Sequence, residues 1–347
     1  MNTIFLNKHI YSADYFRELT PDVIEDQPIY LKDIFSFLHQ WFDDSQVIDV
    51  KTSGSTGMPK IISLSKETMR QSARATLDFF RLKKNDPVLL CLSANYIAGK
   101  MMLVRAIEGE LDLTAIEPAT VLFIPPKLFR FCAMVPMQVE ETLRVYGNGS
   151  FSCIESLIIG GAPVSSSLEH KLKAVSAACY VTYGMTETAS HVALKRLNTN
   201  EPYRALPGIS FHEDDRHCLI VKAPLLHQDL LSTNDIVELC NSSEFHWKGR
   251  YDFVVNSGGI KIVPEELEKK IEPFLKQPFY FSKRSSQLYG EELILVLEGN
   301  KLSSEAENEL LMLLATILTK YEKPKAVYYI QAFEYTSNGK LKRQIFF

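Results

Sequence analysis

A segment of nine residues, rich in glycine and hydroxyl groups, has the composition of an anion-binding loop. It runs Thr52-Ser53-Gly54-Ser55-Thr56-Gly57-Met58-Pro59-Lys60. Glycines let backbone N–H groups approach an anion, hydroxyls add donors and lysine adds positive charge. The spacing departs from the Walker A pattern, in which lysine directly follows the second glycine. We predict a phosphate-binding loop of another kind, and the alternative is a flexible surface linker.

A second polar segment, Tyr183-Gly184-Met185-Thr186-Glu187-Thr188, follows an apolar run that is typical of a buried strand. Ligands of open α/β sheets bind beyond the carboxyl ends of the strands. A tyrosine there could stack on a base, and the carboxylate of Glu187 could hold Mg²⁺. The alternative is a polar turn after a core strand.

Two later segments combine glycines with charged residues. Gly249-Arg250-Tyr251-Asp252 is followed closely by Asn256-Ser257-Gly258-Gly259, and Ser337-Asn338-Gly339-Lys340 lies near the C-terminus. A Gly-Gly pair beside a strand permits close approach of a ligand or of another chain segment. The structural alternatives are a hairpin turn that leads into a helix and a basic tail on a terminal hairpin.

Strands and helices alternate over the first two thirds of the chain. We expect buried strands at Pro87–Leu92, Val121–Ile124, Ser156–Ile159 and Cys179–Tyr183, and helices at Leu31–Phe42, Lys66–Phe80 and Ser165–Val175. This alternation is typical of an α/β domain, in which helices cover a mostly parallel sheet.

The pattern changes after His217 to short strands separated by turns. We expect strands at Cys218–Lys222, Asp235–Cys240, Phe245–Trp247, Phe253–Val255, Leu293–Leu297 and Ala326–Ile330, and helices at Pro264–Pro273 and Ser304–Tyr321. The chain is therefore predicted to form a large α/β domain with a small β region over residues 1–251. A small α+β domain follows over residues 252–347, with the joint at Asp252.

Composition excludes several classes of protein. A length of 347 residues suggests about two domains, and 46% apolar with 23% charged residues is ordinary for a globular protein. The net charge of −4 argues against nucleic acid as a partner. Six scattered cysteines suit free thiols in a reducing cytoplasm. The sequence shows neither a secretory leader nor a run long enough to span a membrane, so we predict a cytoplasmic protein.

One further segment has metal-like residues, His212-Glu213-Asp214-Asp215-Arg216-His217-Cys218. It lacks the spaced ligand pairs of structural zinc sites. We therefore predict a solvated hairpin loop there.

Taken together, in this order and spacing, the segments resemble the adenylate-forming superfamily of acyl-CoA synthetases, peptide-synthetase adenylation domains and luciferases. Gly160-Gly161-Ala162-Pro163 looks like the adenine-side loop of that family. Ser232-Thr233-Asn234-Asp235 resembles its Thr-Gly-Asp segment, with Asn234 in place of glycine. Family members usually carry a longer stretch before the phosphate loop than the roughly 50 residues found here. The resemblance implies the family fold, the substrates ATP and CoA, and Mg²⁺.

The resemblance also implies residue roles. The phosphate loop would hold the β- and γ-phosphates through Thr52, Ser53, Gly54, Ser55, Thr56, Gly57 and Lys60. Thr186 and Glu187 would contact the α-phosphate and Mg²⁺, and Lys340 would reach the α-phosphate and the attacking carboxylate as a catalytic residue. The rest of the nucleotide site would comprise Gly161, Ala162, Tyr183, Gly184, Asp235 and Arg250. A CoA tunnel would be lined by Ser257, Gly258 and Gly259, and Asp252 would be the hinge.

Within that superfamily, the stretch Asn95–Arg105 resembles the substrate helix of compact o-succinylbenzoate–CoA ligases of menaquinone biosynthesis. Relatives often have a histidine before Gly99, where this chain has Asn95-Tyr96. A buried arginine needs an anionic partner, and the substrate has a second carboxylate. We therefore predict a substrate pocket that includes Gly99, Arg105 and His191. The alternatives are an arginine that snorkels to the surface and a histidine of the core.

Three functions stay open on this evidence. The first is an o-succinylbenzoate–CoA ligase, possible as a homo-oligomer because compact relatives often are. The second is another acyl-CoA synthetase or an enzyme that loads a carrier protein. The third is a nucleotide-binding relative without catalysis.

Overall fold

The computed structural model describes residues 3–51, 61–197, 199, 201–226, 228–335 and 341–346. These residues form two compact units. The first comprises Met1–Ser210 with Lys222–Leu231, and the second comprises Phe211–Val221 with Ser232–Phe347. The predicted phosphate loop and Lys340 lie outside the described residues.

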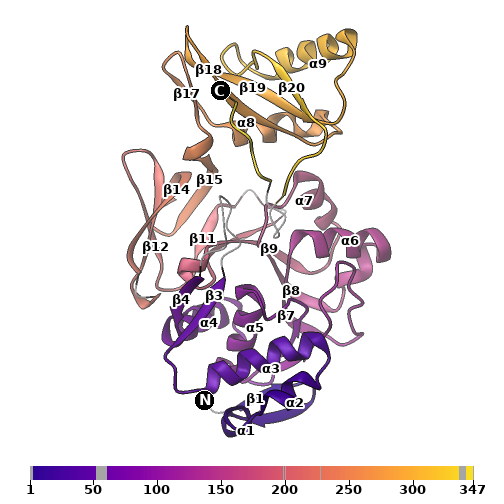
Figure 1. Cartoon of the computed structure of the whole chain (residues 1–347), viewed down its shortest axis with the longest axis vertical. Helices are drawn as coiled ribbons and strands as arrows, with labels where there is room; N and C mark the ends of the chain where they lie inside the picture. Colours follow the sequence, from indigo (N-terminus) through magenta and orange to yellow (C-terminus); the bar gives the residue numbers. More distant parts are fainter. Residues whose placement is uncertain are drawn as a thin grey trace. The chain divides into compact units, whose positions relative to one another are not determined.

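The first unit is built on a mostly parallel sheet (Figure 1). Neighbouring strands run parallel from β9 through β8, β7, β5 and β6 to β1. Two strands pair antiparallel at the ends of this series, β2 with β1 and β10 with β9. The bounds are β1 Thr3–Leu6, β2 His9–Ser12, β5 Pro87–Leu90, β6 Asp112–Ala115, β7 Phe129–Met134, β8 Ile154–Ile159, β9 Ala178–Gly184 and β10 His191–Arg196, and β11 Tyr203–Ala205 pairs antiparallel with β10.

Helices cover both faces of this sheet. Along β5, Val88 and Leu90 join one hydrophobic core while Leu89 joins the other, because successive side chains of a strand point to opposite faces. The first core contains α3 Ile29–Phe42, α4 Lys66–Phe80 and α5 Ile97–Glu108. The second contains α6 Pro136–Tyr146 and α7 Ser166–Leu172. The short α1 Ala13–Arg17 and α2 Pro21–Glu25 precede α3.

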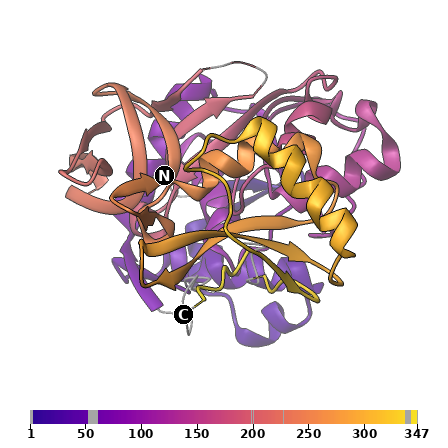
Figure 2. The ribbon, with the colours of Figure 1, turned by 90° about the horizontal axis from the view of Figure 1, so that it is seen from above.

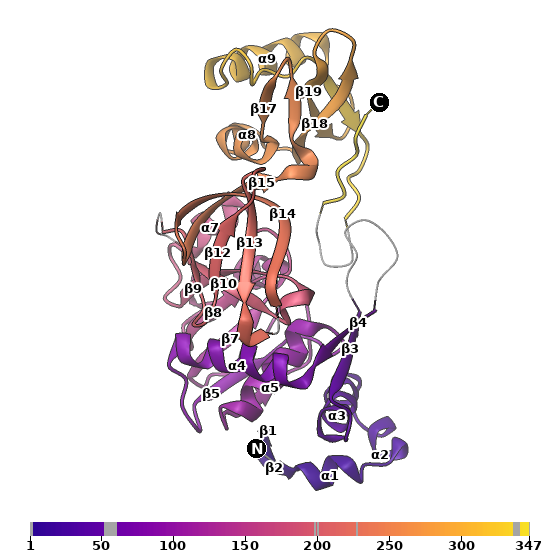
Figure 3. The same ribbon diagram turned by 90° about the vertical axis from the view of Figure 1, so that its left-hand side faces the viewer.

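A two-stranded hairpin, β3 Val47–Lys51 and β4 Ile61–Ser65, pairs outside the main sheet (Figure 3). Its antiparallel register ends at Lys51 opposite Ile61, so the predicted phosphate loop connects the two strands. Ser65 then caps α4 by accepting a hydrogen bond of 2.9 Å from the backbone N–H of Thr68. A capped helix start fixes where the chain leaves the hairpin.

The second unit contains strands, or parts of strands, of two sheets. One contains β12 Ser210–Glu213, β13 Cys218–Ala223, β14 Gln228–Asn241 and β15 Glu244–Arg250 as neighbours in that order. The other has the order β17-β16-β19-β18, with β20 parallel to β19. Its bounds are β16 Val255–Ser257, β17 Ile260–Ile262, β18 Phe279–Ser286, β19 Gly290–Glu298 and β20 Val327–Ile330. One hydrophobic core joins this sheet to α8 Pro264–Ile271 and α9 Ser304–Ile317, and Figure 2 shows α9 lying across the strands.

Most expected elements are present. The helices expected at Ser165–Val175 and Pro264–Pro273 end earlier, at Leu172 and Ile271, and the strand expected at Asp235–Cys240 begins earlier, at Gln228. Three further expectations were wrong. Val121–Ile124 is irregular, and the strand lies at Phe129–Met134, beyond two consecutive prolines that cannot donate to a ladder. The strand expected at Phe253–Val255 lies at Val255–Ser257, because Phe253 is the last residue of a 3₁₀ turn that begins at Tyr251. The helix that starts at Ser304 ends at Ile317, before the extended Leu318, and not at Tyr321.

The metal-like segment is a hairpin loop, as predicted. It connects β12 to β13, and His217 adopts a φ of +61° there. In the part of the chain that the structure describes, no group of three or more potential metal ligands gathers. The six cysteines are free. None of the described helices is long and apolar enough to cross a membrane.

The two compact units divide the chain differently from the predicted domains of residues 1–251 and 252–347. Asp252 lies inside the second unit, about twenty residues after the Ser232 at which its main part begins. The prediction at Asp252 concerns a joint about which the chain moves, and it stays a prediction.

Candidate functional site

Glu187 lies on a tight turn directly after β9. The 3₁₀ turn η2, Thr186–Thr188, is held by the Thr188 hydroxyl, which accepts from the Met185 N–H at 3.1 Å and lies 2.6 Å from the Ser190 carbonyl. Gly184 permits the close return of the chain, because a Cβ there would lie 2.4 Å from the Ser190 carbonyl oxygen. The turn thus presents Glu187 at the carboxyl end of a parallel strand, where α/β sheets bind ligands.

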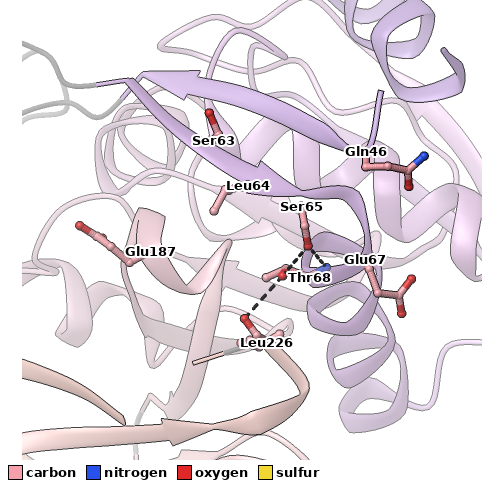
Figure 4. Close-up of a pocket in the computed structure, with 8 residues that line it drawn as sticks. All are labelled: Gln46, Ser63, Leu64, Ser65, Glu67, Thr68, Glu187 and Leu226. Carbon is pink, nitrogen blue, oxygen red and sulfur yellow. Dashed lines mark hydrogen bonds between the residues drawn. The ribbon is translucent and has the colours of Figure 1, made fainter. Parts of the chain in front are cut away.

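A cavity of about 350 Å³ opens beside this turn (Figure 4). Its lining comes from β4, the start of α4, the turn η2 and the 3₁₀ turn η3 Pro224–Leu226. The lining residues are Gln46, Ser63, Leu64, Ser65, Glu67, Thr68, Glu187 and Leu226. All belong to the first unit. Because β4 directly follows the predicted phosphate loop, this cavity adjoins the hairpin that carries that loop.

Side-chain oxygen atoms at this cavity are of the kind that binds a hard metal cation. Glu187 supplies a carboxylate, and Ser63 and Ser65 supply hydroxyls. The Glu67 carboxylate points away from that of Glu187 (Figure 4) and accepts a hydrogen bond from Gln71 at 2.6 Å. Magnesium is usually held by one or two carboxylates together with substrate phosphates, rather than by an all-protein cage. This oxygen set therefore fits Mg²⁺ that is bound mainly through a nucleotide.

The predicted adenine-side residues gather at the ends of neighbouring strands. Gly161 and Ala162 follow β8, while Tyr183 lies in β9, which is parallel to β8. The carboxyl ends of two parallel neighbours meet at one edge of the sheet, so the structure brings these residues to the same edge. Gly161 has a φ of +88°, which favours glycine there. Their contact with adenine stays a prediction.

Arg105 and His191 form a buried basic pair in the first unit. Arg105, on α5, is 2% exposed and donates to the Ser190 Oγ at 2.7 Å. The same hydroxyl lies 3.2 Å from Nδ1 of His191, and Thr76 Oγ1 lies 3.4 Å from its Nε2. The structure therefore joins two predicted pocket residues through Ser190.

Burial controls the charge of both groups. It lowers the pKa of Arg105 to about 9, because the charged form loses its hydration. Burial and the charge of Arg105 hold the pKa of His191 well below its ordinary value, so this imidazole is neutral near pH 7. Among the described residues no carboxylate forms an ion pair with Arg105, and its Nε has no hydrogen-bond partner. Arg105 does not snorkel to the surface.

A second, small crevice lies next to His191. It is lined by Gln71, Ser72, Ala75, His191, Leu206, Pro207, Ile209 and Leu226. Leu226 thus borders both this crevice and the larger cavity at Glu187. Gly99 lines neither the crevice nor the larger cavity. A Cβ at Gly99 would lie 2.2 Å from the Ser93 carbonyl oxygen, so the close approach of α5 to the segment at Ser93 requires glycine.

In the second unit, Asp235 and Arg250 face each other across the β14–β15 ladder. Arg250 Nη1 lies 3.6 Å from the Asp235 Oδ1, and its Nη2 donates to the Asp252 carboxylate at 2.7 Å. Asn234, which stands where the family has glycine, donates to the other Asp252 oxygen at 3.0 Å. The structure therefore brings the two predicted ribose-binding residues and the predicted hinge residue together.

The predicted CoA-tunnel residues form the turn of the β16–β17 hairpin. Ser257 pairs with Ile260, and Gly258 and Gly259 adopt φ values of +58° and +84° between them. Two consecutive positive φ values are typical of a tight two-residue hairpin turn. The hairpin alternative thus explains both glycines, and a role toward CoA stays a prediction.

Sequence reasoning missed four residues that the structure places at these sites. They are Ser190 and Leu226 in the first unit, and Trp247 and Glu265 in the second. The position of Ser190 beside His191 could have suggested the first. No pattern in the sequence singles out the other three, because each acts through tertiary contacts.

Comparison with known proteins places the chain in a family. Residues 51–212 match the model of the AMP-binding enzyme family. A solved structure of an acyl-CoA synthetase (AMP-forming)/AMP-acid ligase II-like protein from Dyadobacter fermentans is 33% identical, with a TM-score of 0.62. The match covers 94% of this chain and 97% of that one. The chain belongs to the AMP-binding enzyme family. The expected adenylate-forming fold is thereby confirmed.

More distant relatives carry more specific names. A protein of Lactococcus lactis named 2-succinylbenzoate–CoA ligase is 22% identical, and the match covers 98% of this chain and 84% of that one. Another of that name from Salmonella typhimurium is 24% identical, and this chain covers 59% of its length. The structure of o-succinylbenzoate CoA synthetase from Bacillus subtilis with ATP and magnesium shares the fold, at 18% identity, a TM-score of 0.69, and coverage of 85% of this chain and 68% of that one.

Proposed function

We propose that this protein is an ATP-dependent acid–thiol ligase that converts o-succinylbenzoate into o-succinylbenzoyl-CoA. Membership of the AMP-binding enzyme family supports the adenylating chemistry. The names of the curated relatives support this particular acid. The structural observation that carries the proposal is Arg105, a fully buried guanidinium without a carboxylate partner among the described residues.

An unpaired buried cation is unfavourable, because burial removes its hydration without supplying an opposite charge. A dicarboxylic acid resolves this problem. One carboxylate is activated, and the other stays charged and needs a cation. Arg105, held by Ser190 and next to a neutral imidazole, supplies the positive charge. Of the residues predicted for the acid pocket, His191 lines the small crevice, and Leu226 borders both this crevice and the larger cavity. Arg105 and Gly99 line neither of these two cavities, so their contact with the acid stays a prediction.

The reaction proceeds in two steps. A carboxylate oxygen attacks the α-phosphorus of ATP, the bond to the β-phosphate oxygen breaks, and pyrophosphate leaves. The CoA thiol then loses its proton and attacks the acyl carbon, and AMP leaves with the electrons of the broken acyl–oxygen bond. No side chain forms a covalent intermediate, so the protein contributes positioning and charge stabilisation.

The predicted residue roles divide between the two units. In the first, Thr52–Lys60 holds the β- and γ-phosphates, Thr186 and Glu187 face the α-phosphate, and Tyr183 and Gly161 flank adenine. In the second, Asp235 and Arg250 bind the ribose hydroxyls. Bound magnesium neutralises phosphate charge and withdraws electron density from the α-phosphorus.

The main test is AMP formation from ATP, Mg²⁺ and o-succinylbenzoate, with and without CoA. We expect turnover that yields the thioester and requires all three substrates. Turnover with a different acid only would keep the ligase chemistry and overturn the assigned substrate. An absence of AMP release with any acid would favour a nucleotide-binding relative without catalysis.

The role predicted for Lys340 can be tested by measuring the two half-reactions separately. We propose that Lys340 stabilises the first transition state only, as a positive charge toward the α-phosphate and the attacking carboxylate. Lys340→Ala should then abolish adenylation yet still convert supplied acyl adenylate to thioester. Equal loss of both half-reactions would contradict this role. A cytoplasmic location, a homo-oligomer and rotation about Asp252 remain predictions.

A further inference from the structure

The strand β15 contains a bulge at the point where it faces Asp235. The ladder pairs Asp235 with Arg250 and Ile236 with Gly249, but the next residue of β14, Val237, pairs with Trp247. One extra residue, Lys248, is therefore inserted into β15. Bulges of this kind re-aim side chains, and they are over-represented next to active sites.

The bulge changes which side chain points at Asp235. In a regular strand, residues 250 and 248 share a face and residue 247 points to the opposite one. With the extra residue, Trp247 and Arg250 lie on the same face as Asp235. Diagonal neighbours across a ladder are within reach of an aromatic side chain. The indole Nε1–H of Trp247 donates to the Asp235 Oδ1 at 3.1 Å.

Helix α8 supports the bulge from the other side. The Glu265 Oε1 accepts the backbone N–H of Arg250 at 3.2 Å. Gly249 leaves room for this carboxyl group, because a Cβ there would lie 2.5 Å from the Glu265 Oε2. One turn further along, the Lys269 ammonium lies 5.2 Å from the centre of a Trp247 ring and donates to the Trp247 carbonyl at 3.4 Å. The position of the indole is therefore fixed by the backbone and by the helix.

We propose that Trp247 is a positioning residue for nucleotide binding, which acts by holding the Asp235 carboxylate in the orientation that receives the ribose hydroxyls. This inference rests on the proposed function, in which Asp235 binds ribose. The attraction between a carboxylate and a guanidinium is strong over a range of orientations, so it does not by itself fix the rotation of the carboxylate. A directional N–H donor restricts that rotation, because hydrogen bonds weaken steeply away from linearity. The indole thus orients Asp235 without adding charge.

The two tryptophans of the chain allow a matched test. Trp247→Phe removes the N–H donor and keeps an aromatic ring. Trp41→Phe makes the same chemical change in the core of the first unit, where Trp41 is 3% exposed. We expect Trp247→Phe to raise the KM for ATP about tenfold, the usual effect of losing one hydrogen bond to a charged group. The kcat at saturating ATP and the KM for the acid should be unchanged, and Trp41→Phe should leave all three unchanged.

Two results would overturn the inference. One is an unchanged KM for ATP in Trp247→Phe. The other is an equal loss of kcat and of affinity for every substrate together with a lower Tm, which would make Trp247 a structural residue only.

Fluorescence supplies a measurement that does not depend on turnover. In Trp41→Phe, Trp247 is the sole tryptophan. Addition of AMP should change its emission, and the further substitution Asp235→Asn should abolish that change at the same AMP concentration. This measurement decides the question if Trp247→Phe does not fold. AMP binding, measured calorimetrically, without any change in Trp247 emission would contradict the inference alone. No AMP binding by the wild-type chain would contradict the proposed function itself.

Discussion

Two arginines, one in each unit, stand in opposite environments. Arg105 is 2% exposed and has no ion pair with a carboxylate among the described residues. Arg250 has a side chain that is 40% exposed, lies 3.6 Å from the Asp235 carboxylate and binds that of Asp252. The lack of a carboxylate partner is more unfavourable for Arg105 than it would be for Arg250, because Arg105 is buried. Arg250 has carboxylate partners within the chain, and we propose that an anionic ligand supplies the partner of Arg105.

The largest effect should follow from removing Arg105. We expect Arg105→Ala to raise the KM for o-succinylbenzoate by about a thousandfold, because loss of one partner from a buried charge pair costs about 4 kcal/mol. The KM for ATP should change less than about twofold. Steady-state kinetics with each substrate varied in turn measures both.

Arg105 also has a control for stability. Arg105→Met keeps most of the side-chain volume and removes the unpaired charge, so the apoprotein should be at least as stable as the wild type. Arg144→Ala, at an exposed pair with Glu141, should change neither the KM nor the Tm. A fall in stability for Arg105→Met with an unchanged KM for the acid would make Arg105 a structural residue.

The contributions of Glu265 and His191 to the free energy of unfolding should change with pH in opposite directions. Burial raises the pKa of Glu265 to about 7, so the folded state binds this proton more tightly than the unfolded state does. Stability from Glu265 is therefore fully present below pH 4.5 and is lost as the pH rises through about 7, by about 3 kcal/mol. The pKa of His191 is lowered, so its contribution is lost as the pH falls below about 6.5.

Urea unfolding from pH 5 to pH 8 tests this difference. Glu265→Gln should abolish the fall in stability that Glu265 causes between about pH 5 and 7 and keep the dependence that His191 contributes. His191→Asn should abolish the rise in stability between about pH 5 and 6.5 and keep the dependence that Glu265 contributes. Arg343 and Glu268 also act on Glu265, the first favouring and the second opposing its ionisation. The Glu268 pair with Arg343 is present in both proteins, so it cancels in the comparison. Parallel pH curves for Glu265→Gln and the wild type would refute the assignment.

Removal of the Asp235 carboxylate should raise the KM for ATP selectively, by a smaller factor than that expected for Arg105→Ala and the acid. Asp235→Ala removes the acceptor proposed for the ribose and leaves Arg250 with Asp252 as a carboxylate partner. We expect the KM for ATP to rise about thirtyfold, because about 2 kcal/mol of charge-assisted hydrogen bonding is lost. The KM for the acid should stay constant. Should both KM values rise together, the two regions would not be separate sites.

The smallest effect should come from Asn234. Its hydrogen bond joins the half-buried Asn234 to the exposed Asp252 and is expected to contribute about 0.5 kcal/mol. Asn234→Gly restores the residue that the family carries. It should change the KM for ATP less than about threefold. A large change would give Asn234 a role in holding the predicted hinge residue.

Helices and strands whose ends depend on nearby residues were predicted well from the sequence. The helix Lys66–Phe80 was predicted with its observed ends, because Ser65 caps it and its apolar residues recur with helical spacing. The strand Phe129–Met134 was missed, since its burial comes from parallel neighbours rather than from a visible alternation. Glycine-rich segments predicted a nucleotide site by composition, and the roles of their residues stay predictions.

The supporting residues of the site could not be predicted in the same way. Trp247 reaches Asp235 only because Lys248 bulges from β15, and no local pattern encodes that register shift. Glu265 is charged in the first turn of a helix, where an exposed acid is the ordinary expectation. Its burial against Gly249 is a tertiary effect.

The contact between Gly249 and Glu265 also constrains how the sequence can vary. A Cβ at residue 249 would lie 2.5 Å from both the Glu265 carboxyl group and the Val263 side chain. A homologue with alanine at 249 would therefore need a shorter residue at 265, and a different acceptor for the N–H of residue 250. We expect these two positions, fifteen residues apart on a strand and a helix, to change together as natural sequences diverge.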